Sequence, residues 1–277
     1  SFITSIFSLL VIWILTQTTK SSLLIFGSVF SFIPVLILLL FNVYAFSNRY
    51  KKYKPKISSW KKEYFKEIFG LGASFFIIQF SVIILFSTDN FIITQLFGPE
   101  EVVPYNIAQK YFSISLLVFN MILTPYWSSI TEAYTNRDFP WIKRSINNLR
   151  KISFASMLLT LLMVLIAPFF YKLWIGNMVF IPFNLTLSMA VYFILNILYS
   201  PYNAFINGVG KIQIQMYTLI GAAVLNIPLS IFLVKFTSLG VAGVIIATIL
   251  CILPHAVICP LQYSKIINNR AFGLWNK

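Results

Sequence analysis

Residues 152–175, ISFASMLLTLLMVLIAPFFYKLWI, form an apolar run of 24 residues whose single charged side chain is Lys172. A helix needs roughly 20 predominantly apolar residues to cross the hydrocarbon core of a bilayer, which is about 30 Å thick. This run therefore predicts a transmembrane α-helix. The polar segment before it, residues 136–151, carries five basic side chains and one acidic side chain, as is typical of a loop beside a membrane surface.

The composition of the whole chain is that of a membrane protein. Of its 277 residues, 58% are hydrophobic and 10% are charged, whereas about 25% of the residues of a soluble domain are charged. The mean hydropathy is +0.83. Both cysteines lie inside one apolar run, and the chain has one histidine. The sequence therefore indicates no disulfide framework, no metal site and little histidine chemistry.

Seven further segments are long and apolar enough to be transmembrane helices. They are residues 2–18, 22–46, 69–96, 104–132, 183–207, 212–235 and 240–263. The sequence therefore predicts an all-α polytopic membrane protein with eight transmembrane helices. We expect a tight connection at Lys20 and Ser21 between the first two helices.

The longest polar segment lies between the second and third predicted helices. From residue 48 to residue 67 it has eight basic and two acidic side chains. Within it, Trp60, Tyr64 and Phe65 fall near one face of a helix, which is typical of a helix that lies on a membrane surface. A plain linker is the alternative.

Basic residues also predict the orientation of the bundle, because loops rich in Lys and Arg stay in the cytoplasm. If the segment 48–67 is cytoplasmic, alternation of the helices leaves only Lys20, Lys172 and Lys235 on the opposite side. This places the C-terminus in the cytoplasm. The net charge of +14 then reflects topology and attraction to lipid headgroups, and we predict no nucleic-acid partner.

The predicted helix 104–132 carries a polar stripe along one face. At about 100° per residue, the stripe contains Asn106, Lys110, Ser113, Asn120, Thr124, Ser128 and Thr131, with only Leu117 interrupting it. Such a stripe predicts the wall of a water-filled cavity, and the charge of Lys110 favours this interpretation. Hydrogen bonding between tightly packed helices is the alternative.

A weaker polar face lies on the predicted helix 183–207. It contains Tyr192, Asn196, Ser200, Asn203 and Asn207. We expect Pro201 to interrupt this helix, because proline removes a backbone hydrogen bond. Broken helices line the cavities of many transporters.

Three other ionisable side chains fall within predicted helices. Asp89 is expected at a depth similar to that of Lys110, so it either forms a structural ion pair, tunes Lys110, or takes up a coupling proton or Na⁺. Glu132 lies near the cytoplasmic boundary, and we expect a carboxylate that either snorkels to the surface or pairs with the basic loop, with a functional site as the alternative. His255 has no partner in the sequence and is expected to be a packing or interface residue.

The motifs of several enzyme classes are missing. The sequence contains none of the motifs Gly-x-Ser-x-Gly, His-Glu-x-x-His and Gly-x-x-x-x-Gly-Lys-Ser/Thr. It therefore lacks the residues that these motifs supply for catalysis in hydrolases, metalloproteases and ATPases. We therefore predict that the protein is not an enzyme. Residues 208–211, GVGK, instead predict a tight turn whose glycines adopt positive φ.

Several motifs resemble those of one known family. Residues 88–93 (TDNFII) and 97–108 (FGPEEVVPYNIA) resemble the start of the second lobe of Wzx-type oligosaccharide flippases. These flippases are the polysaccharide-transporter branch of the MOP superfamily, with a MATE-like fold. Residues 125–128 (PYWS), Glu132 with Ala133, and residues 207–211 (NGVGK) are also similar to that family.

The resemblance implies two bundles of six helices joined by a cytoplasmic linker. On this template, residues 1–47 are the last two helices of a first lobe, 48–68 the linker, 69–267 a complete second lobe, and 268–277 a cytoplasmic tail. The chain begins at Ser1 without an initiating methionine. We therefore expect the earlier helices of the first lobe to be missing from it.

The resemblance also implies a function. It is the translocation of undecaprenyl-pyrophosphate-linked oligosaccharides across the bacterial cytoplasmic membrane, by alternating access, for O-antigen, capsule or exopolysaccharide synthesis. Lys110 is the candidate pyrophosphate contact, and Asn106, Ser113, Asn120, Tyr192, Asn196 and Asn203 are candidate sugar-facing groups. The expected partners are this substrate, membrane lipids, a polysaccharide polymerase and a chain-length regulator. We expect no cofactor, and coupling to H⁺ or Na⁺ stays open.

Other functions compete with this interpretation. A multidrug exporter or a lipid II flippase belongs to the same superfamily, but drug exporters favour acidic sites for cations, whereas the stripe is cationic. A membrane-embedded glycan polymerase or ligase also handles lipid-linked sugars. Such an enzyme needs a large extracytoplasmic loop with catalytic charges, and the predicted outer loops are short.

Overall fold

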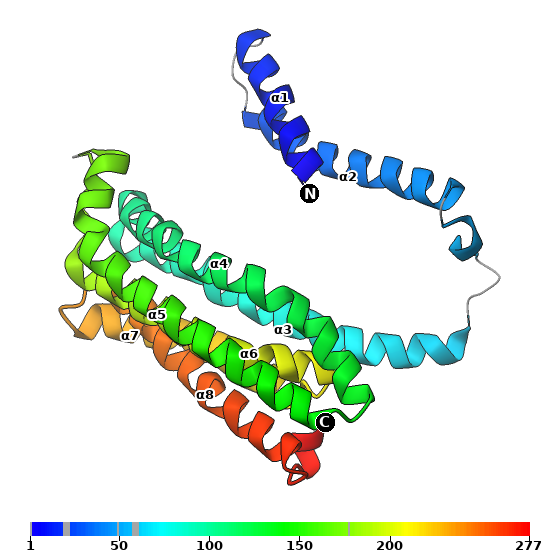
Figure 1. Ribbon diagram of the computed structural model, residues 1–277. Coiled ribbons are helices and arrows are strands. Elements are labelled where there is room, and N and C mark those ends of the chain that lie inside the picture. The colour runs from blue at the N-terminus through cyan, green and yellow to red at the C-terminus, as the bar shows by residue number, and fades with distance from the viewer. Residues whose placement is uncertain (1, 19–22, 49, 57–60, 177) are drawn as a thin grey trace. The chain divides into compact units, whose positions relative to one another are not determined.

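The computed structural model describes residues 2–18, 23–48, 50–56, 61–176 and 178–277 (Figure 1). Within these residues it contains eight α-helices and no β-strand. The chain divides into two compact units, Ser1–Phe65 and Lys66–Lys277. The all-α fold predicted from the sequence is therefore confirmed for the described part of the chain.

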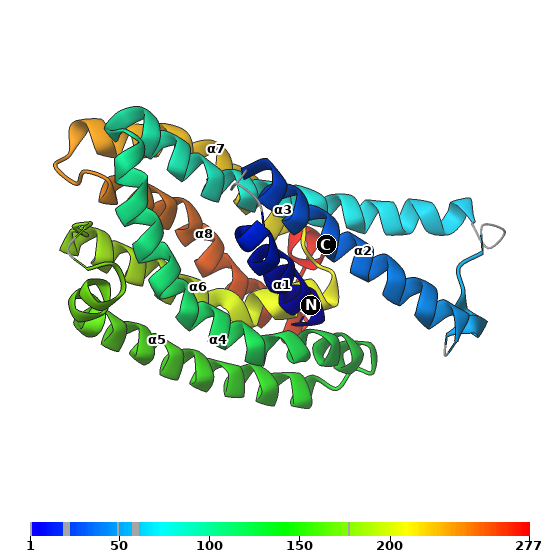
Figure 2. The ribbon, with the colours of Figure 1, turned by 90° about the horizontal axis from the view of Figure 1, so that it is seen from above.

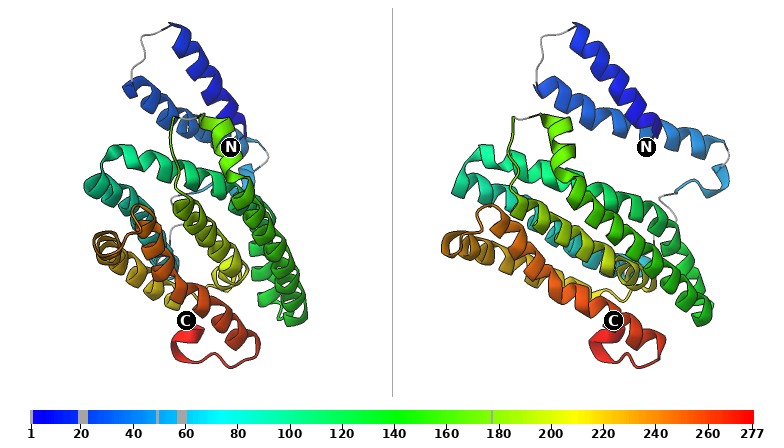
Figure 3. Two further views of the ribbon diagram at one scale, coloured as in Figure 1. Left: turned by 90° about the vertical axis from the view of Figure 1, so that its left-hand side faces the viewer. Right: turned by 60° about the vertical axis from the view of Figure 1, so that its left-hand side comes forward.

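The first unit is a helical hairpin. α1 (Phe2–Thr18) and α2 (Leu23–Ser47) pack against each other, and a short 3₁₀ helix, η1 (Lys51–Tyr53), follows α2. Figure 3 shows the hairpin in two orientations. The predicted connection at Lys20 and Ser21 lies outside the described residues.

The second unit is a helical bundle. Its helices are α3 (Lys62–Phe97), α4 (Val102–Thr135), α5 (Phe139–Ile175), α6 (Phe183–Val209), α7 (Gln213–Phe236) and α8 (Ala242–Ile267), with the 3₁₀ helices η3 (Pro99–Glu101) and η4 (Gly273–Asn276). α6 packs against α4, α5 and α8, and α7 packs against α8 (Figure 2). α6 is therefore the central helix of this unit.

Length and composition suit these helices to a membrane. Within the described residues, seven helices from α2 to α8 are long and apolar enough to cross a bilayer, and α1 contains a shorter apolar stretch, Ile6–Leu15. Large apolar side chains remain on the outside of the bundle: Leu165 is 78% exposed and Phe169 is 70% exposed. These surfaces need hydrocarbon around them.

Two helices begin earlier than the apolar pattern predicts. α3 begins at Lys62 and α5 at Phe139, so part of each basic segment is helical rather than a loop. Lys and Arg are good helix formers, and the side chain of Asp138 caps α5 by accepting a hydrogen bond from the Trp141 N–H at 3.0 Å. With 37 residues, α5 is about 55 Å long, so it extends beyond the membrane. Trp60, one of the three aromatic residues of the predicted surface helix, lies outside the described residues.

The expected break at Pro201 is wrong. α6 continues through Pro201, and α4 likewise continues through Pro125. Neighbouring helices and Ser or Thr side chains satisfy the backbone groups that a proline frees in a membrane helix.

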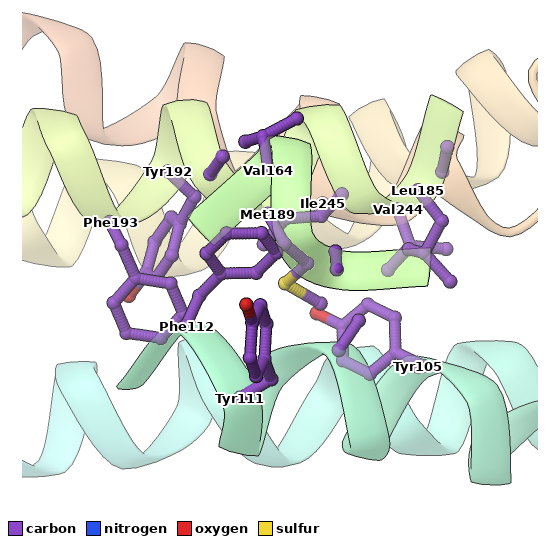
Figure 4. Packing of buried hydrophobic residues seen from close by; sticks show 14 of the residues in the cluster. Tyr105, Tyr111, Phe112, Val164, Leu185, Met189, Tyr192, Phe193, Val244 and Ile245 are labelled. Atoms are coloured by element: carbon purple, nitrogen blue, oxygen red, sulfur yellow. The ribbon is translucent and has the colours of Figure 1, made fainter. Parts of the chain in front are cut away.

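Aromatic and aliphatic side chains from α4, α5, α6 and α8 fill the core. Phe112 is fully buried beside Tyr111, whose ring centroid lies 4.9 Å away, and Met189 and Tyr192 of α6 complete the centre of this cluster (Figure 4). A second cluster around Ile130 and Phe205 occupies the other end of the same helices. α4 is therefore fixed against α6 along most of its length.

The turn after α6 uses its two glycines differently. Gly210 has φ +71 and ends α6, as predicted, but Gly208 is helical. A Cβ on Gly208 would lie 3.3 Å from the Trp127 carbonyl oxygen and 3.3 Å from the Thr131 hydroxyl. Gly208 is therefore needed for the close approach of α6 to α4, and only Gly210 is needed for its backbone conformation.

This contact predicts a specific stability defect. We expect Gly208→Leu to destabilise the protein by about 1–3 kcal/mol, because the new side chain overpacks the α4–α6 contact. Gly221→Leu on α7 is the matched control, since nothing lies within 4 Å of a Cβ at that position. The measurement is the thermal unfolding midpoint in detergent. Equal midpoints for the two variants would contradict the close approach.

Candidate functional site

The carboxylate of Asp89 lies inside the second unit. Asp89 is 1% exposed and follows Leu85 by one turn on the inward face of α3. The Tyr105 hydroxyl of α4 donates to Asp89 Oδ2 at 2.7 Å. The Thr248 hydroxyl of α8 lies 3.3 Å from Oδ1 and 3.2 Å from Oδ2. One acidic side chain therefore joins three helices.

The hydrogen-bond network around Asp89 continues to α7. Asn226, which is fully buried, donates through Nδ2 to Thr248 Oγ1 at 2.7 Å. Thr88 Oγ1 lies 3.5 Å from Asn226 Oδ1. Ser230 follows one turn along α7, and its buried hydroxyl has no partner within the described residues. Neutral oxygen and nitrogen atoms thus surround the carboxylate, and no described cationic side chain forms an ion pair with it.

α3 is the helix that depends most on these bonds. It approaches the rest of the unit less closely than α4, α6, α7 and α8 approach one another. Its contacts run through side chains: Leu85 packs with Ala222, Ala223 and Cys251, and Phe86 meets Tyr192 edge to face at 6.0 Å. Asp89 therefore ties the most loosely packed helix of the bundle to α4 and α8.

Lys110 points elsewhere. It is exposed, and no described residue forms an ion pair or hydrogen bond with its ammonium group. Lys110 lies five positions after Tyr105 on α4. At about 100° per residue, its side chain therefore points about 140° around the helix axis from the Tyr105 side chain, which contacts Asp89. The Asp89–Lys110 ion pair, one of the alternatives from the sequence, is not formed in the described part of the chain.

The polar stripe of α4 lies on the outside of the second unit. Asn106 and Ser113 are half-buried, whereas Lys110, Asn120, Thr124, Ser128 and Thr131 are exposed. Hydroxyl groups in the stripe bond mostly within α4, for example from Thr124 to the Asn120 carbonyl at 2.7 Å and from Ser113 to the Lys110 carbonyl at 2.7 Å. Among the described residues, Thr131 is the one member of the stripe whose hydroxyl reaches a neighbouring helix, at the Gly208 carbonyl, 2.9 Å away.

A hollow of about 610 Å³ lies at one end of the stripe. Its lining residues are Thr124, Trp127, Ser128, Thr131 and Glu132. The Trp127 ring is 43% exposed, and on α3 the ring of Phe75 lies 6.4 Å from it. Glu132 is exposed and forms no ion pair with any described residue, so of the two expected arrangements the pairing with the basic loop is not formed here. Sequence reasoning missed Trp127, although its i+3 spacing from Thr124 places it on the stripe.

The α6 candidates lie in a different environment. Tyr192 and Asn196 are only 2% and 9% exposed. Asn196 donates to the Tyr192 carbonyl at 2.8 Å and accepts from the Tyr199 hydroxyl at 2.7 Å. Asn203 is half-buried, and its side-chain oxygen has no partner within the described residues. Tyr192 and Asn196 therefore lie in the core in this arrangement of helices, and their role as sugar-facing groups stays a prediction.

His255 is a packing residue, as expected. It is 1% exposed, and its Nδ1 lies 3.0 Å from the Thr218 hydroxyl. The Tyr199 ring meets it edge to face at 5.1 Å, and Cys259 Sγ lies 3.4 Å from Nε2. No group of three or more His, Cys, Asp or Glu side chains gathers within the described ranges.

A family model and two solved structures match this chain. The MatE family model matches residues 74–232, which is more than half of the 277 residues. The chain belongs to the MatE family. The matched segment of this MatE protein includes Asp89, Lys110 and the hollow at Trp127.

Two solved structures share the fold. The first is the outward-facing conformation of a multidrug resistance MATE family transporter of the MOP superfamily, at 17% identity and a TM-score of 0.69, over 89% of this chain and 57% of that chain. The second is a crystal structure of a MATE mutant, at 18% identity and a TM-score of 0.66, over 88% of this chain and 56% of that chain. The MatE chain thus spans little more than half the length of either structure. None of the curated proteins matches it.

The Asp89 network predicts a stability effect. We expect Tyr105→Phe to lower the free energy of unfolding by about 1–3 kcal/mol, because it removes the shortest hydrogen bond to a buried carboxylate. Tyr111→Phe is the matched control and should cost less, since the Tyr111 hydroxyl donates to the Met163 main-chain carbonyl at 3.0 Å. Denaturation of both variants in detergent measures the difference. An equal loss in the two variants would mean that the Tyr105–Asp89 bond has no special weight.

Proposed function

We propose that this protein moves undecaprenyl-pyrophosphate-linked oligosaccharide repeat units across the bacterial cytoplasmic membrane by alternating access. The observation that carries the proposal is Lys110, an exposed cation without an acidic partner among the described residues, on the polar stripe of a membrane helix. A charge in a membrane span usually faces a cavity or pathway. An anionic substrate group gives this charge a partner.

The chemistry of the stripe fits the two polar parts of such a substrate. The Lys110 ammonium donates charge-assisted hydrogen bonds to the pyrophosphate. Asn106, Ser113 and Asn120 present amide and hydroxyl groups of both hydrogen-bonding types to the sugars. The polyprenyl chain stays in the bilayer, so the protein has to shield only the polar part of the substrate.

In this proposal Asp89 is the coupling residue. Burying a carboxylate among membrane helices is costly unless a proton or cation neutralises it. Uptake of H⁺ or Na⁺ at Asp89 therefore stabilises the packing of α3 against α4 and α8, and release weakens it. A ligand shifts such an equilibrium by its differential affinity for the two arrangements.

Substitution of Lys110 tests the substrate site. The full-length gene carrying Lys110→Ala is expected to lose at least about 90% of the surface polysaccharide in a flippase-deficient strain, because a buried charge-assisted contact is worth more than tenfold in affinity. Lipid-linked repeat units should accumulate in the cytoplasmic leaflet. Lys110→Arg should restore export, since it keeps the charge.

Lys235→Ala is the control for this experiment. Lys235 is an exposed lysine in the last turn of α7, outside the stripe, and its loss should leave export unchanged at equal protein level. Normal export by the Lys110→Ala variant would overturn the proposed substrate contact.

A multidrug exporter is the second candidate, and the hollow at Trp127 favours it. An exposed carboxylate, Glu132, stands there beside an exposed indole ring, and this pair attracts organic cations. One of the two solved structures that share the fold is also that of a multidrug resistance transporter. In the flippase proposal, the same Trp127 ring stacks on a sugar.

Glu132→Gln separates the two candidates. The amide keeps the shape and hydrogen-bonding capacity of the side chain but removes its charge. A flippase should keep most of its export with Glu132→Gln and lose it with Trp127→Ala. For a drug exporter, Glu132→Gln should reduce resistance to organic cations about tenfold or more, and Lys110→Ala should have no effect. The assays are surface polysaccharide and minimal inhibitory concentrations in the same strains.

A further inference from the structure

A second hollow, of about 440 Å³, opens between α5 and α6. Arg150, Lys151, Phe154 and Met157 of α5 and Leu198 and Tyr202 of α6 are among its lining residues. None of them belongs to the polar stripe of α4. Arg150 and Lys151 directly precede the apolar run 152–175, so the hollow lies across the boundary between the polar and the apolar part of α5.

The chemistry of this hollow changes along its length. Phe154 and Met157 follow Arg150 by one and two turns, which places Met157 about 10 Å deeper along α5. α6 returns in the opposite direction, so Tyr202 lies on the side of the cations and Leu198 on the apolar side. One end of the hollow therefore has two positive charges and a phenol group, and the other end has the apolar side chains of Phe154, Met157 and Leu198.

The two positive charges have no acidic partner. No carboxylate lines the hollow, and Arg150 and Lys151 form no ion pair within the described part of the chain. The nearest acidic residue in the sequence, Asp138, is twelve positions before Arg150 and already caps α5. An anion is the complementary ligand for this end of the hollow.

We propose that the hollow between α5 and α6 binds an anionic phospholipid, with its phosphate on Arg150 and Lys151 and one acyl chain along Phe154, Met157 and Leu198. Arg binds phosphate through two parallel hydrogen bonds. Basic pockets between transmembrane helices at the cytoplasmic side bind anionic lipid headgroups, and the positive-inside pattern assigns this end of α5 to the cytoplasmic side.

The apolar half of the hollow favours a lipid over a soluble phosphate. Phe154 is 63% exposed and Leu198 is 47% exposed, and both lie in segments apolar enough to cross the membrane. Hydrocarbon has to cover them. A phospholipid supplies both the anion and the chain in one molecule.

Native mass spectrometry of the full-length protein, titrated with phosphatidylglycerol in detergent, tests this site. The double variant R150Q/K151Q should bind phosphatidylglycerol at least about tenfold more weakly. K143Q/R144Q is the matched control, because it removes an equally exposed basic pair of α5 that does not line the hollow. Its affinity should equal that of the unmodified protein.

A second variant tests the apolar end without changing any charge. L198W fills the hollow and should weaken phosphatidylglycerol binding, whereas L161W, at an exposed α5 position outside the hollow, should not. Equal losses for both basic pairs would show diffuse attraction and overturn the site. It is also overturned if phosphatidylcholine binds equally well, if glycerol phosphate competes fully, or if undecaprenyl phosphate binds where phosphatidylglycerol does not. These outcomes do not depend on the proposed transport function.

Discussion

A buried carboxylate imposes the constraint on which this bundle depends. Asp89 lies where a charge without a partner is very costly, and it accepts hydrogen bonds from α4 and α8 at 2.7 and 3.2 Å. The helix that carries it packs less closely than its neighbours. In the proposed mechanism the position of α3 depends on how the charge of Asp89 is neutralised, so that a proton or a Na⁺ ion acts as a switch for this helix.

α4 connects this switch to the proposed substrate surface. Its inner face contributes Tyr105 to the Asp89 network and Phe112 to the core, and its outer face carries Lys110. Close packing against Gly208 of α6 holds α4 in place. In this proposal, a shift of α3 relative to α4 acts on the helix that carries Lys110, because a rigid helix transmits motion between its two faces.

The sequence predicted what depends on periodicity and length. Apolar runs located the membrane helices, and the 100° periodicity of α4 grouped Lys110 and Asn120 on one face, which is exposed in the second unit. Periodicity groups residues on a face but does not say what the face contacts, so the sequence does not show that Tyr192 and Asn196 lie in the core of this arrangement. The length of an apolar run does not show how far a helix extends into the charged residues before it. The sequence therefore does not predict that α3 begins at Lys62 and α5 at Phe139.

The sequence does not predict the hydrogen-bond partners of Asp89. Thr248 lies 159 positions away, and no local pattern relates the two residues. The sequence placed Asp89 within a predicted helix and offered Lys110 as its possible ion-pair partner, whereas the structure gives it Tyr105 and Thr248. The exposed ring of Trp127 was likewise visible only once Phe75 and the hollow beside it were known.

The unfolding midpoint of the full-length protein, with and without Asp89→Asn, tests the central claim most directly. Midpoints are measured in NaCl and in choline chloride at equal ionic strength, and across a pH series. We expect the midpoint of the unmodified protein to rise with Na⁺ or with falling pH, because a ligand that binds the folded state more tightly than the unfolded state stabilises the folded state. Asp89→Asn, already neutral, should not respond. The same response in both proteins would show that the cation or proton acts elsewhere, and would contradict the role of Asp89 as the switch.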